Sequence, residues 1–212
     1  MLPLLAAALA SFLTLGLLVE TSPRVRGWDL AVTQSVAEDT TPVVTDLARA
    51  LTHLADWNVY MALSALAVGA LLALRRFRLA GFLLTVVLGQ WLLSNAVKQL
   101  VARDRPDLDQ LVNASGYSFP SGHASAAAAG YLALALVVAA LRPRWNLRLL
   151  VGIAVAIAIV VAATRVLLGV HWTTDVLAGL AFGWAWCLFC AGLFGVRSTP
   201  QAALAEKATV PR

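Results

Sequence analysis

The sequence alternates long apolar stretches with shorter polar segments. Six apolar stretches stand at 2–19, 57–74, 79–98, 122–141, 149–168 and 176–196. A helix of about 20 predominantly apolar residues is long enough to cross the hydrocarbon core of a bilayer. We therefore predict an all-α integral membrane protein, built as a bundle of six transmembrane helices.

Polar residues fill the intervals between these stretches. Residues 20–56 are polar and acidic, and we expect short helices at the membrane surface at 29–36 and 43–54. Residues 1–197 are expected to form one membrane domain. The tail, 198–212, has no periodicity and is expected to be disordered.

Composition supports this assignment, because 60% of the residues are hydrophobic, only 13% are charged and the mean hydropathy is +0.80. The stretch 2–19 has no preceding basic residue and no clear cleavage site, so a retained helix is favoured over a signal peptide. Cys187 and Cys190 lie inside an apolar stretch and are expected to be buried thiols. Gly179 and Gly183 predict a helix-packing face.

The net charge of +5 would suit a nucleic-acid-binding protein, but the basic clusters stand between apolar stretches and favour membrane topology instead. With both termini on one side, that side holds nine Lys and Arg and one acidic residue. The other side holds seven Lys and Arg and ten acidic residues. The positive-inside rule then predicts cytoplasmic termini, with the loops 99–120 and 169–175 outside a bacterial inner membrane.

The segment from Pro120 to His123 predicts the start of a helix. Ser121 is a good N-cap, Gly122 lets a ligand approach the backbone, and an alanine-rich run follows. Such an N-terminus has free N–H groups that bind anions, phosphate above all. The alternative is an ordinary capped helix with an incidental histidine.

Charged and titratable residues gather at the span ends on the face of the membrane that holds the loops 99–120 and 169–175. They are Lys98, Arg105, His123, Arg165, His171 and Asp175. Three fixed cations suit a phosphate, whose charge spreads over its oxygens during transfer.

Two imidazoles could supply the chemistry at this face. Asp175 follows His171 by four residues, so its carboxylate can reach the ring, fix the tautomer and leave the other nitrogen free to attack. His123 could protonate the leaving oxygen. The alternatives are a structural hydrogen-bonded pair and a metal site of two His and one Asp; the three cations disfavour a divalent ion.

Three motifs occur in order: Lys98-x6-Arg105-Pro106, Pro120-Ser121-Gly122-His123 and Thr164-Arg165-x5-His171-x3-Asp175. Their order and spacing resemble the signature of the type 2 phosphatidic acid phosphatase family, which shares its site with vanadium haloperoxidases and glucose-6-phosphatase. The third motif usually starts with Ser; Thr164 keeps the hydroxyl and adds a methyl group. A haloperoxidase is disfavoured, because those relatives are mostly soluble and much larger.

The resemblance implies a six-helix membrane phosphatase that needs no metal and no cofactor. By this resemblance His171 is the nucleophile and forms a phosphohistidine, Asp175 orients it, and His123 is the general acid. The residues implied to hold the phosphoryl oxygens are Lys98, Arg105, Ser121, Gly122 (through its N–H) and Arg165.

Other polar residues near the motifs are expected to do less. Solvated charges are expected at Asp104, Asp107 and Asp109. Arg103 is expected at the surface, with a contact to the second phosphate of a diphosphate substrate as the alternative. Tyr117 and Phe119 either line a path for a lipid chain or anchor the loop. His53 is expected to be structural, and interhelical hydrogen bonds are expected of Gln90 and Asn95.

The expected function is hydrolysis of a membrane lipid phosphate or diphosphate that reaches the site sideways from the leaflet. Undecaprenyl diphosphate, phosphatidylglycerophosphate and phosphatidic acid are the candidate substrates. The alternative is a non-catalytic six-span lipid carrier or transporter. That class would carry polar groups at mid-span, whereas here they cluster at one face.

Overall fold

The computed structural model describes residues 1–107 and 110–196, so the expected tail at 198–212 and Asp109 lie outside the described residues. All regular structure in the described part of the chain is helical. This confirms the predicted all-α class. The helices are α1 (Leu2–Thr21), α2 (Pro23–Asp39), α3 (Pro42–Thr52), the short 3₁₀ turn η1 (His53–Ala55), α4 (Trp57–Ala73), α5 (Phe77–Val101), α6 (Gly122–Leu141), α7 (Leu147–Leu167) and α8 (Thr173–Leu193).

Six helical segments within the described residues are long and apolar enough to cross a membrane. They are α1, the segment from α3 to α4, and α5 to α8. Many large apolar side chains point away from the bundle, among them Leu66, Leu92 and Leu149, which are 73%, 61% and 62% exposed. Apolar side chains in such numbers on the outer surface are expected where lipid replaces water. The fold is therefore that of a membrane protein.

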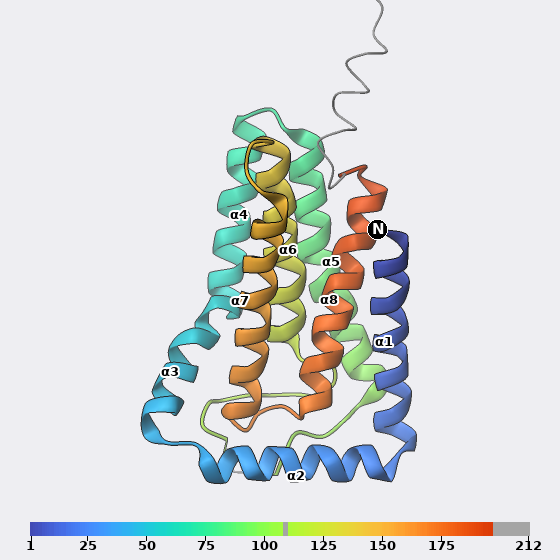
Figure 1. Cartoon of the computed structure of the whole chain (residues 1–212), viewed down its shortest axis with the longest axis vertical. Coiled ribbons are helices and arrows are strands. Elements are labelled where there is room, and N and C mark those ends of the chain that lie inside the picture. The colour runs from blue at the N-terminus through green and yellow to red at the C-terminus, as the bar shows by residue number, and fades with distance from the viewer. Residues whose placement is uncertain (108–109, 197–212) are drawn as a thin grey trace, which may run out of the picture.

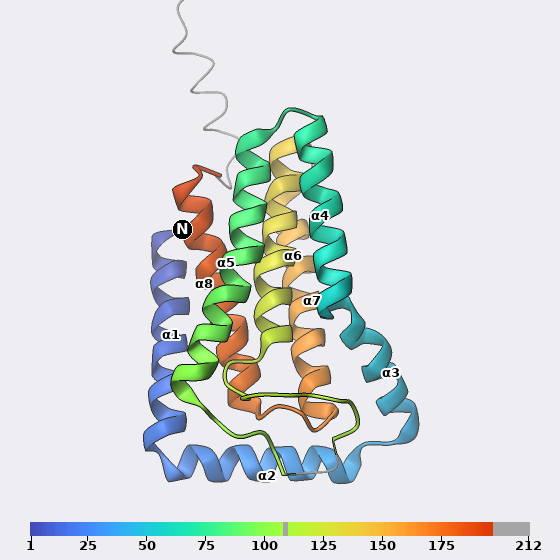
Figure 2. The same cartoon turned by 180° about the vertical axis from the view of Figure 1, so that it is seen from behind.

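Two helices lie outside the bundle proper. Helix α2 runs crosswise beneath one end of the bundle, and α3 rises obliquely from it towards α4 (Figures 1 and 2). The helix expected at 29–36 is present but longer than predicted, because α2 begins at Pro23. Ser22 caps it, and proline is favoured at the first helical position. Thr41 caps α3 in the same way, one residue before Pro42.

The core of the bundle forms around α6, which packs against α5, α7 and α8. Gly179 and Gly183 bring α8 into backbone contact with α6. A Cβ at Gly179 would stand 2.7 Å from Ser121 O, and one at Gly183 only 2.4 Å from Ser125 O. This confirms the predicted packing face, because any side chain there would force the two helices apart.

Several smaller predictions can be checked in the same region. Cys187 and Cys190 are fully buried in α8, as expected. Gln90 Nε2 donates to Ser125 Oγ at 2.8 Å and so links α5 to α6, as expected. The prediction for Asn95 was wrong, because its amide donates to the carbonyl of Trp91 within α5.

Helix α1 is part of the folded bundle. It packs against α8, and its Phe12 stacks on Phe119 with ring centroids 6.1 Å apart. Phe119 is buried there, which favours the loop-anchoring alternative over a lipid path. Retention of α1 in the mature chain stays a prediction.

Candidate active site

Every site residue named from the sequence lies at the end of the bundle that faces α2. The carboxyl ends of α5 and α7 and the amino ends of α6 and α8 meet there, and the loop between α5 and α6 runs between them and α2 (Figure 2). Lys98 and Arg165 stand in the last turns of α5 and α7. The remaining residues occupy the connecting loops and the first turns of α6 and α8: Arg105, Ser121, Gly122, His123, His171 and Asp175.

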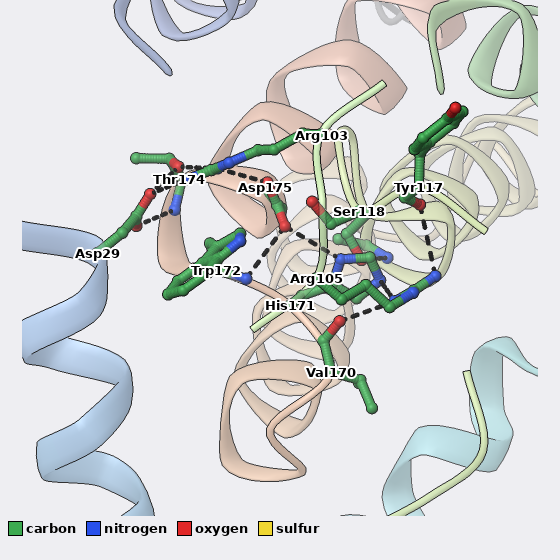
Figure 3. Close-up of polar contacts among 12 residues, drawn as sticks. Asp29, Arg103, Arg105, Tyr117, Ser118, Val170, His171, Trp172, Thr174 and Asp175 are labelled. Atoms are coloured by element: carbon green, nitrogen blue, oxygen red, sulfur yellow. Dashed lines mark hydrogen bonds and ion pairs between the residues drawn. The ribbon is translucent and has the colours of Figure 1, made fainter. Parts of the chain in front are cut away.

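His171 and Asp175 form the contact expected from their spacing. His171 Nδ1 lies 3.3 Å from Asp175 Oδ2, and both side chains are buried (Figure 3). An ionised carboxylate only accepts hydrogen bonds, so Nδ1 carries the proton. Nε2 is left with its lone pair and lies 3.3 Å from Arg105 Nη1, from which it accepts.

Burial keeps this imidazole neutral. Desolvation lowers the pKa of His171 from about 6.5 to about 3, against the opposing effect of Asp175 and with the help of the charges on Lys98 and Arg105. An unprotonated nitrogen at neutral pH is what a nucleophilic histidine requires.

Two of the predicted cations are held by backbone carbonyls of one loop. Lys98 Nζ donates to Tyr117 O at 2.7 Å, and Arg105 donates to Gly116 O and Ser115 O, both at 2.9 Å. Arg105 Nη1 also donates to Val170 O at 2.7 Å, next to His171. Burial lowers the pKa of Arg105 from its usual range, and the Asp175 charge opposes this.

The start of α6 has the geometry of an anion-binding helix N-terminus. Ser121 Oγ accepts from Ala124 N at 3.5 Å, which confirms the predicted N-cap, and Ser121 N donates to Asp175 O at 3.0 Å. A Cβ on Gly122 would meet no heavy atom within 4 Å, so the space beside this backbone is open. The first N–H groups of a helix have no partner within the helix, so this end of α6 suits an anion.

The segment from α3 to α4 supplies two contacts that the sequence did not predict. His123 Nε2 lies 2.9 Å from Asp56 Oδ1, and the other carboxylate oxygen of Asp56 contacts His53. Arg165 Nη1 donates to Thr52 Oγ1 at 2.7 Å. Arg165 is only 4% exposed, and its Nε has no hydrogen-bond partner in the described part of the chain.

Arg103 does not lie at the surface, and that expectation was wrong. Its side chain is 12% exposed and bridges two buried carboxylates, Asp29 and Asp175, at 2.7 Å from each (Figure 3). The guanidinium also lies 5.4 Å from the ring centroid of Trp172. Because both carboxylates already occupy it, Arg103 is not available for the second phosphate of a diphosphate.

The remaining expectations concern residues at the edge of the site. Asp104 and Asp107 are exposed, as predicted. Thr164 donates its hydroxyl to Val161 O within its own helix, a contact that a serine hydroxyl could also make, so the Thr-for-Ser difference adds only a methyl group. Among residues 1–107 and 110–196, no group of three or more His, Cys, Asp or Glu side chains could hold a metal ion.

A cavity of about 180 Å³ lies between α4, α5 and α6, and Lys98, Gly122 and His123 line it. Most of the other lining is apolar or aromatic. It includes Trp57 and Trp91, whose ring centroids are 5.4 Å apart and which are 48% and 45% exposed. Since both rings reach the outer surface of the bundle, the cavity connects the lipid-facing surface with the cationic end.

A carboxylate-held imidazole beside clustered cations that are buried or partly buried, at the end of a membrane-spanning bundle, is the arrangement of a membrane-embedded phosphatase. Comparison with known proteins agrees with this class. The model of the PAP2 superfamily matches residues 78–198, and the chain belongs to this superfamily. It is a phosphatase, and the carrier alternative is set aside.

The individual relatives are also named as phosphatases. Phosphatidylglycerophosphatase B of Bacillus subtilis is 33% identical over 175 residues, which cover 81% of this chain and 85% of the relative. Lipid A 1-phosphatase of Rhizobium etli is 36% identical over 115 residues, which cover 50% and 46%. The crystal structure of a transmembrane PAP2 type phosphatidylglycerolphosphate phosphatase from B. subtilis superposes with a TM-score of 0.84 at 28% identity, and covers 89% of this chain and 94% of that one.

Proposed function

We propose that the protein removes the terminal phosphate from a phosphorylated membrane lipid, with phosphatidylglycerophosphate as the first candidate, through a phosphohistidine on His171. The observation that carries the proposal is the orientation of His171. Its Nδ1 is held by Asp175, and its Nε2 lone pair faces Arg105 at 3.3 Å. An anionic phosphoryl group drawn to Arg105 would arrive next to the free nitrogen.

The proposed reaction has two steps. In the first, His171 Nε2 attacks phosphorus, the bond from phosphorus to the lipid oxygen breaks, and His123 gives that oxygen a proton. In the second, His123 takes a proton from water, the water oxygen attacks phosphorus, and the bond to Nε2 breaks to release inorganic phosphate. Asp175 stabilises the positive charge that the ring of His171 carries between the two steps.

Five groups are proposed to hold the phosphoryl oxygens: Lys98, Arg105, Arg165, Ser121 and the N–H of Gly122. The charge that develops on these oxygens is best stabilised by fixed, poorly hydrated donors. The buried, unpartnered Nε of Arg165 supports its inclusion, because a buried donor without an acceptor is costly unless a ligand satisfies it.

A lipid substrate is supported by the cavity between α4, α5 and α6. It joins the lipid-facing surface near Trp57 and Trp91 to Lys98 and His123, so acyl chains could remain among apolar side chains while the head group reaches the cations. Relatives named for phosphatidylglycerophosphate and for lipid A support the same substrate class. We further propose that the site faces the outside of a bacterial inner membrane, on the positive-inside count.

The test is phosphate release by the purified protein in detergent from phosphatidylglycerophosphate, phosphatidic acid and undecaprenyl diphosphate. His171→Ala should abolish release and leave the protein folded. Radiolabelled substrate should transfer label to wild-type protein, in a linkage that is stable to alkali and labile to acid. Asp39→Asn, an exposed change at the end of α2, is the matched control. Full turnover by His171→Ala would overturn the covalent mechanism.

A further inference from the structure

Helix α2 carries a carboxylate on its buried side. Most of its side chains are exposed, and its buried residues are Asp29 and Thr33. Asp29 has no exposed surface, which is rare for an aspartate unless its charge is paired. This crosswise helix therefore presents a charged group to the bundle, beside the partly buried apolar side chains of Val25 and Val36.

Asp29 completes the amino end of α8. Its Oδ1 accepts from Thr174 N at 2.9 Å, and its Oδ2 accepts from the Thr174 hydroxyl (Figure 3). Thr174 is the second residue of α8, whose first N–H groups have no partner within the helix. A carboxylate is favoured at this position because the helix dipole is positive there.

Arg103 joins this carboxylate to the one that holds His171. Its Nη2 donates to Asp29 Oδ2 and its Nη1 to Asp175 Oδ1, each at 2.7 Å. The other oxygen of Asp175 accepts from Trp172 N at 3.0 Å and faces His171 Nδ1. Both oxygens of Asp175 are thus fixed, and the carboxylate cannot rotate away from the imidazole.

We infer that Asp29 and Arg103 are positioning residues. They orient Asp175 and determine how strongly its negative charge stabilises the ring of His171. The inference rests on the proposed role of His171 as nucleophile. Asp29 and Asp175 carry two negative charges, and Arg103 carries one positive charge. With Asp29 present, these three side chains together keep one net negative charge, which stabilises the imidazole of His171 when it becomes cationic.

Loss of the Asp29 charge would leave Arg103 paired with Asp175 alone. Asp175 would then stabilise the cationic ring less, in a buried site where such interactions are strong. The effect falls on the attacking nitrogen, because Lys98, Arg105 and Arg165 make no hydrogen bond to Asp29 or Arg103. Asp29→Asn should therefore slow the chemical step and leave phosphate binding unchanged.

The experiment is single-turnover hydrolysis of a short-chain, radiolabelled phosphatidylglycerophosphate by the full chain in detergent, with saturating enzyme. Under these conditions the rate constant reports only the folded sites, so a misfolded fraction does not change it. Asp29→Asn should slow the step by about tenfold to a hundredfold, the range seen when the hydrogen-bond partners that orient metal-binding histidines are removed. Inhibition by inorganic phosphate should stay the same. Asp39→Asn, on the same helix but exposed, should match wild type.

Arg103 gives a second test, should Asp29→Asn fail to fold. Arg103→Lys keeps a charged donor between Asp29 and Asp175 and should retain more of the single-turnover rate than Arg103→Gln, which loses the bridge that orients Asp175, again with unchanged phosphate inhibition. Asp29→Asn or Arg103→Gln within twofold of the wild-type rate would overturn the inference, and so would weaker phosphate inhibition in either variant. Failure of the proposed function is separate, because wild-type protein would then release no phosphate, or His171→Ala would release as much as wild type.

Discussion

The low pKa of His171 predicts how stability depends on pH. In the unfolded chain this histidine takes up a proton below about pH 6.5. In the folded protein it stays neutral until about pH 3. Between these values the unfolded state binds the extra proton, so stability must fall as pH falls through this window. Above about pH 7 both states are neutral at this ring and the effect disappears.

The size of the effect follows from the same two pKa values. At pH 5 nearly all unfolded molecules carry the proton and almost no folded molecule does, which costs about 2 kcal/mol relative to pH 7.5. Burial of the ring makes this a large effect for a single residue, because His171 is only 2% exposed. Other titrating groups also contribute, so the prediction concerns a difference between two proteins.

The reference protein is His171→Asn, which keeps a hydrogen-bond donor near Asp175 but cannot titrate. Unfolding of both proteins would be followed by tryptophan fluorescence as SDS is added to detergent micelles, at pH 7.5 and pH 5. Wild type should lose about 2 kcal/mol more than His171→Asn over this interval. Equal losses in the two proteins would refute the reasoning, since His171 would then not be a neutral buried imidazole.

Three further predictions concern other parts of the molecule. Gly183→Ala should destabilise the fold by about 1–3 kcal/mol in the same unfolding assay, because its Cβ would meet a carbonyl oxygen of α6 at 2.4 Å. Gly192→Ala is the control and should not destabilise the fold, because the space around Gly192 is open. Asp56→Asn removes the carboxylate that contacts His123, and it should lower kcat about tenfold or more for alkyl phosphates. The kcat for aryl phosphates should not change, because only a poor leaving group needs the proton of His123. Equal losses for both substrates would contradict this. Excess chelator should leave turnover unchanged, and loss of activity would indicate a metal hydrolase.

Sequence spacing was sufficient wherever the interacting groups are close in the chain. His171 and Asp175 meet because residues four apart share a face, and Ser121 caps α6 because it precedes an alanine-rich helix. The six apolar stretches likewise needed only their length and hydropathy to predict the spanning helices.

The partners contributed by the first polar segment were not predicted, because tertiary docking brings them to the site. Asp29 reaches Arg103 across 74 residues of sequence, and Asp56 reaches His123 across 67. The sequence held little signal for Asp29. It stands four residues before another polar residue, Thr33, but only the structure shows that this side of α2 is buried and that the carboxylate needs a partner inside the protein.

The oxygens around Lys98 and Arg105 have a consequence for turnover. Within the described residues, the oxygen atoms that accept hydrogen bonds from these two cations belong to backbone carbonyls, of Ser115, Gly116, Tyr117, Ser118 and Val170. A carbonyl dipole shields a cation without cancelling its charge. An incoming anion can therefore displace neutral oxygens from these cations without first breaking an ion pair.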